Sequence, residues 1–131
     1  MKGKEVGYWV TTALVATETM AGGVTDLVNG RAKVFSGPAV EDVMRGLGYP
    51  SYFLKILGVC KVPGAVALLA PRLPRLKEWA YAGIAFEMIG AAASHAVRRQ
   101  KREMIVPLAI LGLTLTSWAL RPPKRNIKAA R

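Results

Sequence analysis

The stretch Met104–Leu120, MIVPLAILGLTLTSWAL, contains no charged residue. A helix on the surface of a soluble protein must present a polar face to water, and this stretch has no such face. Its length lies within the range of about 17–25 residues that a helix needs to cross the hydrocarbon core of a bilayer. We therefore predict that this segment is a transmembrane helix.

Three further segments share this composition. The segments 6–28, 52–70, 79–97 and 104–120 together hold 78 residues but only five of the 27 Asp, Glu, Lys and Arg residues of the chain. Strands are excluded because four segments are too few to close a membrane barrel. The sequence predicts an all-α fold, a four-transmembrane-helix bundle forming one integral membrane domain over residues 1–131. The predicted spans are about 6–28, 51–70, 78–97 and 104–120, followed by a basic tail at 121–131.

The longest connection, at about 29–51, contains a pattern of its own. Gly37-Pro38 indicates a helix start, because proline is tolerated in the first turn. Apolar residues then recur at helical spacing: Val40, Val43, Met44 and Leu47. Charged residues occupy the other side: Glu41, Asp42 and Arg45. This pattern predicts a short amphipathic helix at the membrane surface, between spans one and two, ended by Gly46 and Gly48.

The net charge of +11 comes from basic runs that flank the predicted spans. No aromatic interleaving or nucleic-acid motif accompanies them, so we assign them to lipid headgroups rather than to nucleic acid. With four spans, ten Lys and Arg residues lie on the side of the termini and seven on the other side. This excess favours cytoplasmic termini. Aromatic residues are expected in interface belts on both sides. Those near the termini side are Tyr8, Trp9, Trp79, Tyr81 and Trp118, and those near the other side are Tyr49 and Tyr52.

Charged residues lie at the middle of three predicted spans. Glu18, Lys61 and Glu87 are each near the centre of their own span and therefore share a depth. Small residues surround them at helical spacing, which indicates that all three side chains point into the bundle. Because a charge in the bilayer centre is costly, these groups must pair, neutralise or reach water. Two acids facing one lysine predict that one carboxyl is protonated at neutral pH.

A second polar layer is expected nearer the other membrane surface. Asp26 follows Glu18 by eight residues, and His95 follows Glu87 by eight, a rise of about 12 Å along a helix. Lys55 falls at a similar depth and can extend its ammonium to the interface. The single cysteine, Cys60, excludes an intrachain disulfide. No metal-ligand cluster, phosphate-binding loop or Ser/His/Asp set is found in the sequence, so no metal is predicted and no catalytic residue is assigned.

Three motifs in the middle of the chain resemble the DoxX-like family of small integral membrane proteins. They are Gly48-Tyr49-Pro50, the stretch LKEWAYAG at 76–83 and the stretch GAAASH at 90–95. The likeness covers roughly residues 8–97. It implies a four-helix bundle in the cytoplasmic membrane of a prokaryote. The family takes its name from a subunit of a thiosulfate:quinone oxidoreductase, and relatives are described in membrane redox assemblies.

Three interpretations of the buried charges remain open. In the first, the protein is a subunit that supports quinone-linked redox chemistry or binds a small lipophilic molecule, with redox-complex subunits or a second copy as partners. Glu18, Lys61 and Glu87 then line the site, and Asp26 and His95 form a proton path. In the second, the same residues serve a proton-coupled carrier or channel. In the third, they form an ion-pair clasp in a structural scaffold.

Overall fold

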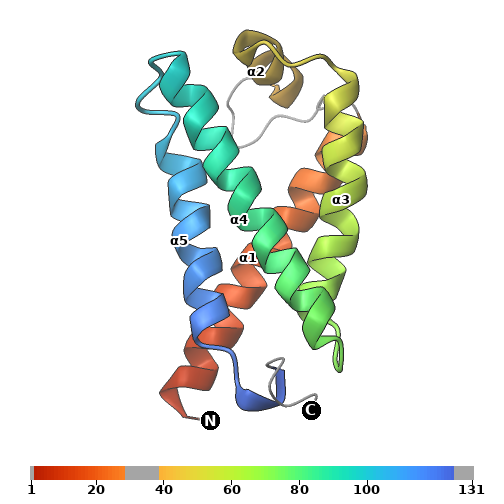
Figure 1. Cartoon of the computed structure of the whole chain (residues 1–131), viewed down its shortest axis with the longest axis vertical. Coiled ribbons are helices and arrows are strands. Elements are labelled where there is room, and N and C mark those ends of the chain that lie inside the picture. The colour runs from red at the N-terminus through yellow and green to blue at the C-terminus, as the bar shows by residue number, and fades with distance from the viewer. Residues whose placement is uncertain (1, 29–38, 126–131) are drawn as a thin grey trace.

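The computed structural model describes residues 2–28 and 39–125, and the regular elements in these two ranges are helices. Four long helices run along the molecule (Figure 1): α1 (Gly3–Leu27), α3 (Tyr52–Leu69), α4 (Pro74–Val97) and α5 (Ile105–Ala119). The short helix α2 (Val40–Leu47) lies at one end, and the single 3₁₀ turn η1 (Pro123–Arg125) lies at the other. The predicted all-α fold is confirmed. Each segment predicted to cross the membrane is helical, within a few residues of its expected bounds.

The four long helices pack as a ring of neighbours. Helix α1 contacts α3 and α5, and α4 contacts the same two helices. The start of α1 and η1 lie at the same end of the molecule (Figure 1), where the Arg125 guanidinium stacks 4.5 Å from the centroid of the Trp9 ring. An even number of helices running from end to end brings both ends of the described chain to one side.

Helix α2 agrees with the predicted amphipathic helix. It ends at Gly48, whose φ of 92° is the left-handed conformation that favours glycine after a helix. The predicted start at Gly37-Pro38 lies outside the described residues, and the helix begins at Val40.

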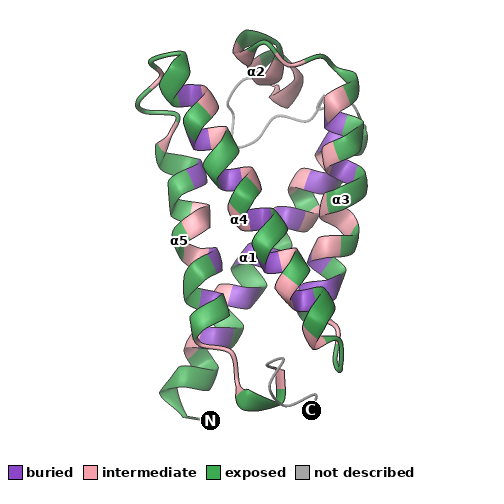
Figure 2. Ribbon diagram, viewed as in Figure 1, coloured by how far each residue is buried: buried purple, intermediate pink, exposed green. Residues whose placement is uncertain are grey.

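Exposed residues run along the outer faces of the long helices (Figure 2). Many of them are large and apolar; Trp79 is 73% exposed and Phe86 is 74% exposed. Hydroxyl-bearing residues are fully buried instead: Thr12, Thr114 and Ser117. Soluble proteins avoid exposed apolar patches of this extent, whereas a hydrocarbon solvent favours them.

Length and composition alone single out one described helix as able to cross a membrane, α3. Helix α5 is apolar but has only 15 residues. Helices α1 and α4 have 25 and 24 residues, and at about 1.5 Å per residue each exceeds the roughly 30 Å of hydrocarbon. Both contain the charged residues that face the interior. Four membrane crossings therefore stay a prediction.

A buried chain of hydroxyl groups links three of the helices. Ser117 Oγ on α5 lies 2.7 Å from Thr12 Oγ1 on α1 and 2.8 Å from the Tyr81 hydroxyl on α4. Tyr81 is 3% exposed and Tyr8 is fully buried. Both tyrosines therefore face other helices and not the outside, and their hydroxyls have protein partners, since Tyr8 accepts from Arg125 at 3.3 Å. Their expected place in an interface belt stays a prediction. Trp79 does face outward, as predicted.

Helices α1 and α3 approach each other most closely at two glycines. A Cβ built on Gly58 would lie 2.8 Å from the backbone oxygen of Gly23 and 2.7 Å from Cγ of Leu27. A Cβ on Gly23 would lie 2.8 Å from Cβ of Lys61. Only glycine allows backbones this close, and small residues at helix contacts are typical of membrane proteins. This contact sets the position of Lys61 opposite Gly23.

Lys77, which precedes the third predicted span, caps the end of α3. Its ammonium donates to the carbonyl of Ala67 at 2.9 Å and also to the carbonyl of Ala70. These are carbonyls in the last turn of the helix, which lack helical partners. Burial, followed by the nearby charges of Arg125 and Arg121, lowers the pKa of Lys77 from 10.5 to about 8.

This lowered pKa predicts how stability depends on pH. Between about 8 and 10.5, the folded protein loses the Lys77 proton while the unfolded chain keeps it, so stability rises with pH in that window. Below pH 8 both states hold the proton, and the difference is constant. We expect Lys77→Met to remove this rise, measured as the difference between variant and parent unfolding temperatures in detergent. An equal rise in both proteins would contradict the assignment.

Candidate functional site

Lys61 lies between two carboxylates from different helices. Its Nζ is 2.9 Å from Oδ2 of Asp26 on α1 and 2.8 Å from Oε1 of Glu87 on α4. The side chains are 14%, 3% and 21% exposed, respectively. We call these three residues the carboxylate–lysine cluster. It joins α1, α3 and α4 by ionic hydrogen bonds in the interior, where such bonds are strongest.

Glu18 lies beside this cluster but is not bonded to Lys61. A Cβ on Gly22 would lie 3.7 Å from Oε1 of Glu18 and 3.6 Å from Nζ of Lys61, so both groups border the same small space. The expectation that Asp26 lies a layer away from Lys61 is therefore wrong, since Asp26 bonds the lysine directly, whereas Glu18 lies near the lysine as expected but without a bond to it. The register explains it: Lys61 stands opposite Gly23, three residues from Asp26 and five from Glu18.

The remaining predicted polar residues differ in their surroundings. His95 is 9% exposed, and its Nδ1 lies 2.8 Å from Oε1 of Gln100. His95 lines the same cavity as the cluster. Among the described residues, no hydrogen bond joins His95 to the cluster. Lys55 is exposed, as expected for a side chain that reaches the interface.

The cluster borders a cavity of about 510 Å³ beneath α2, the α2 cavity. The apolar face of α2 covers it through Val40, Val43, Met44 and Leu47, and α3, α4 and α5 supply further apolar walls. Asp26, Lys61, Glu87 and His95 form its polar part. The apolar face of α2, expected to rest on the membrane surface, therefore faces this interior space. An apolar cavity of this size with a few convergent polar groups is typical of a small-molecule site.

A hydrogen bond connects the segment after α2 to α4 at the wall of this cavity. The Tyr49 hydroxyl lies 2.7 Å from Oγ of Ser94, which donates to the carbonyl of Gly90. The Tyr49 ring stacks on Phe53, with centroids 5.1 Å apart. Sequence reasoning placed Tyr49 in an interface belt and missed this role; the available signal was its place in the Gly48-Tyr49-Pro50 motif.

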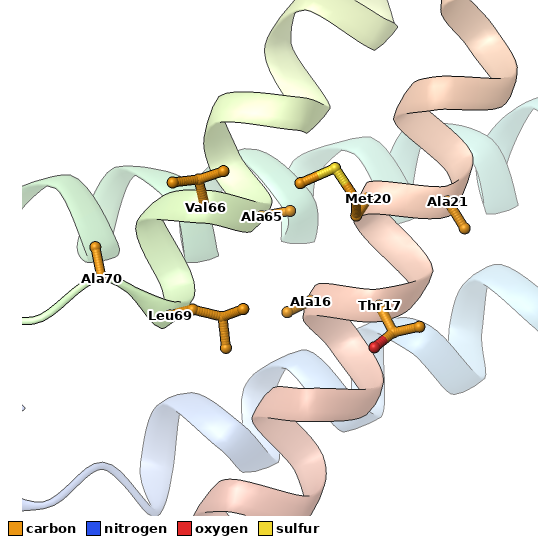
Figure 3. Close-up of a pocket in the computed structure, with 8 residues that line it drawn as sticks. All are labelled: Ala16, Thr17, Met20, Ala21, Ala65, Val66, Leu69 and Ala70. Atoms are coloured by element: carbon orange, nitrogen blue, oxygen red, sulfur yellow. The ribbon is translucent and has the colours of Figure 1, made fainter.

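Two other hollows contrast with the α2 cavity. The α3–α4 cavity, of about 330 Å³, also borders Lys61 and Glu87, but from the side of Leu76 and Trp79. Buried Thr19 lines it, and Thr19 Oγ1 has no hydrogen-bond partner in the described part of the chain. Figure 3 shows the third hollow, an outer groove between α1 and α3 lined by small and apolar residues such as Ala16, Ala21 and Ala65. No charged group lines that groove.

The residues described contain no group of three or more His, Cys, Asp and Glu placed to hold a metal ion. The polar groups that line the α2 cavity are two carboxyls, one ammonium and one imidazole, which are groups able to form hydrogen bonds and exchange protons.

Comparison with known proteins agrees with this architecture. A sequence model of the DoxX-like family matches residues 10–117, which are 108 of the 131 residues. The chain belongs to the DoxX-like family. No curated protein matches the chain, and no solved structure matches it.

Membership makes this DoxX-like protein a membrane protein, in agreement with its apolar exterior. The family match begins near Val10 and ends at Ser117. It therefore includes the whole carboxylate–lysine cluster, the α2 cavity and most of the four long helices. The site described above belongs to the part of the chain that matches the family.

Proposed function

We propose that this protein crosses the membrane four times and binds a small lipophilic molecule in the α2 cavity. One observation supports this proposal above the others: a single cavity joins apolar walls from four helices to Asp26, Lys61, Glu87 and His95. A purely structural clasp needs the ion pairs but not a largely apolar pocket of about 510 Å³ beside them.

A quinone is the occupant that connects this site to redox chemistry. A quinone headgroup needs hydrogen-bond partners and a proton route in an apolar enclosure. The cluster and His95 supply groups of both kinds, with Glu18 next to the cluster. We place the protein in a prokaryotic cytoplasmic membrane with both termini inside, where redox-complex subunits or a second copy are its proposed partners besides lipid. Extraction in mild detergent, followed by mass spectrometry of bound lipids and proteins, tests this assignment.

Filling the cavity tests the binding site directly. Ala91 lines the α2 cavity, so Ala91→Leu places three more carbons in it. We expect this variant to fold but to lose the co-purifying lipophilic molecule, at least about tenfold by mass spectrometry, since a clash in a well-packed site costs more than 1.4 kcal/mol.

Ala21→Leu is the matched control, because Ala21 lines the outer groove, which has no charged group. It should retain the molecule at the parent level. Equal retention by Ala91→Leu and Ala21→Leu would contradict binding in the α2 cavity.

A proton-coupled carrier is the second candidate, favoured by the α3–α4 cavity. Lys61 and Glu87 border both cavities, so their ion pair stands between a space open toward α2 and a space on the opposite side. A carrier requires a binding group reachable from either side in turn. Flux into proteoliposomes that is lost in Glu87→Gln or Glu18→Gln would favour this function over static binding.

A further inference from the structure

The polar groups of the α2 cavity are unbalanced in charge. Among the charged residues that line it in the described part of the chain, Asp26 and Glu87 face one cation, Lys61. Glu18 adds a third carboxyl next to the lysine. The α2 and α5 residues that line the cavity are uncharged. The described lining therefore has one ammonium for two carboxyls, so either the proton predicted on one carboxyl or an additional positive charge completes it.

The polar groups of the cavity also include more free hydrogen-bond acceptors than donors. Lys61 uses one N–H on each carboxylate, and each carboxylate has a second oxygen that can still accept. Ser94 donates to the carbonyl of Gly90, so Tyr49 must donate to Ser94, and the Tyr49 oxygen can only accept. Nδ1 of His95 is already paired with Oε1 of Gln100.

The apolar walls suit a cation as well. The stacked rings of Tyr49 and Phe53 both line the cavity. The face of an aromatic ring attracts a cation within about 6 Å of its centroid. The remaining walls are apolar and include Met44 and Leu57. They disfavour a strongly hydrated ion and favour an organic cation with a large apolar group.

We infer that the occupant of the α2 cavity is a lipophilic ammonium: an apolar body bearing a protonated nitrogen that donates to the free oxygens of Asp26 and Glu87. This inference rests on the proposed function, since it names the class of molecule that the proposed site takes. The inference also distinguishes a cationic ligand, which the site should bind, from a neutral quinone. A neutral quinone offers only acceptors, which Lys61 can bond but the free oxygens of Asp26 and Glu87 cannot.

Three probes of similar compact size test this in the full-length protein in lipid nanodiscs. Adamantylamine carries a cation at neutral pH, as primary amines with a pKa near 10 do. Adamantanol has the same body without the charge, and tetramethylbenzoquinone is a neutral acceptor. We expect calorimetry to show adamantylamine binding at least about tenfold more tightly than either neutral probe. We also expect the preference to disappear in Glu87→Gln.

The possible results separate the inference from the function on which it rests. If the quinone or the alcohol binds as tightly as the amine, the ammonium assignment is wrong and the lipophilic site remains. If none of the three binds, both are wrong. Should Glu87→Gln fail to fold, Phe53→Leu replaces it: it keeps an apolar wall, removes one ring and should weaken the amine more than the alcohol. Equal loss of both probes in Phe53→Leu would also overturn the inference.

Discussion

Replacement of Lys61 with methionine is expected to destabilise the folded protein strongly in detergent solution. The variant removes the cation that both Asp26 and Glu87 bond, at 2.9 Å and 2.8 Å, and leaves two acids facing each other where water is scarce. Removing one partner of a buried ion pair typically costs about 3–5 kcal/mol. That is a large part of the roughly 5–15 kcal/mol that stabilises a typical protein. Size-exclusion chromatography and thermal unfolding in detergent measure the loss.

Two further variants identify the cause. Lys55→Met removes a lysine from the same helix, but an exposed one, and should unfold at the parent temperature. The triple variant Lys61→Met with Asp26→Asn and Glu87→Gln removes every charge of the cluster and should recover most of the lost stability, because no uncompensated acid remains. If Lys61→Met unfolds like Lys55→Met, the cluster does not hold the helices together.

The Gly58→Ala variant should show the second large effect. A single methyl group at this position meets the backbone oxygen of Gly23 at 2.8 Å. Backbone atoms cannot rotate away from the added methyl group as a flexible side chain can, so α1 and α3 must move apart. We expect a cost at the upper end of the roughly 1–3 kcal/mol that overpacking produces. Separation of α1 from α3 should also weaken the bond between Asp26 and Lys61.

Gly64→Ala on the same helix is the control. A Cβ at Gly64 meets nothing within 4 Å, so alanine there should be neutral or stabilise the helix by about 0.5–1 kcal/mol. The two variants should therefore shift the unfolding temperature in opposite directions. A shift of the same size and sign in both would mean that the contact between α1 and α3 is not as close as the structure describes.

The helices could be predicted from the sequence because charge is excluded from long segments and concentrated between them. Even the amphipathic face of α2 follows from the spacing of Val40, Val43, Met44 and Leu47. That Lys61 and Glu87 point inward could be predicted from the small residues around them. Membership of the DoxX-like family was also visible in short motifs of the second and third spans.

The partner of Lys61 could not be predicted in the same way. Counting residues along antiparallel helices gives depth only to within a turn or so, and the choice between Glu18 and Asp26 depends on a shift of a few residues. That shift is set by the contact of Gly23 with Gly58. The contact depends on how the surfaces of α1 and α3 fit together, which the sequence of either helix alone does not show. Tyr8 and Tyr81 show the same limit: an aromatic residue near a helix end suits an interface or an interior, depending on the neighbour it meets.

Helix α2 has eight residues and none of them is buried. A peptide of that length is not helical by itself, because too few turns follow the costly first one. Its helical form therefore depends on the contacts of its apolar side, which lines the α2 cavity. Under the proposed function, an occupant of that cavity would add to these contacts, so binding would raise the helical content of this segment without displacing the four long helices.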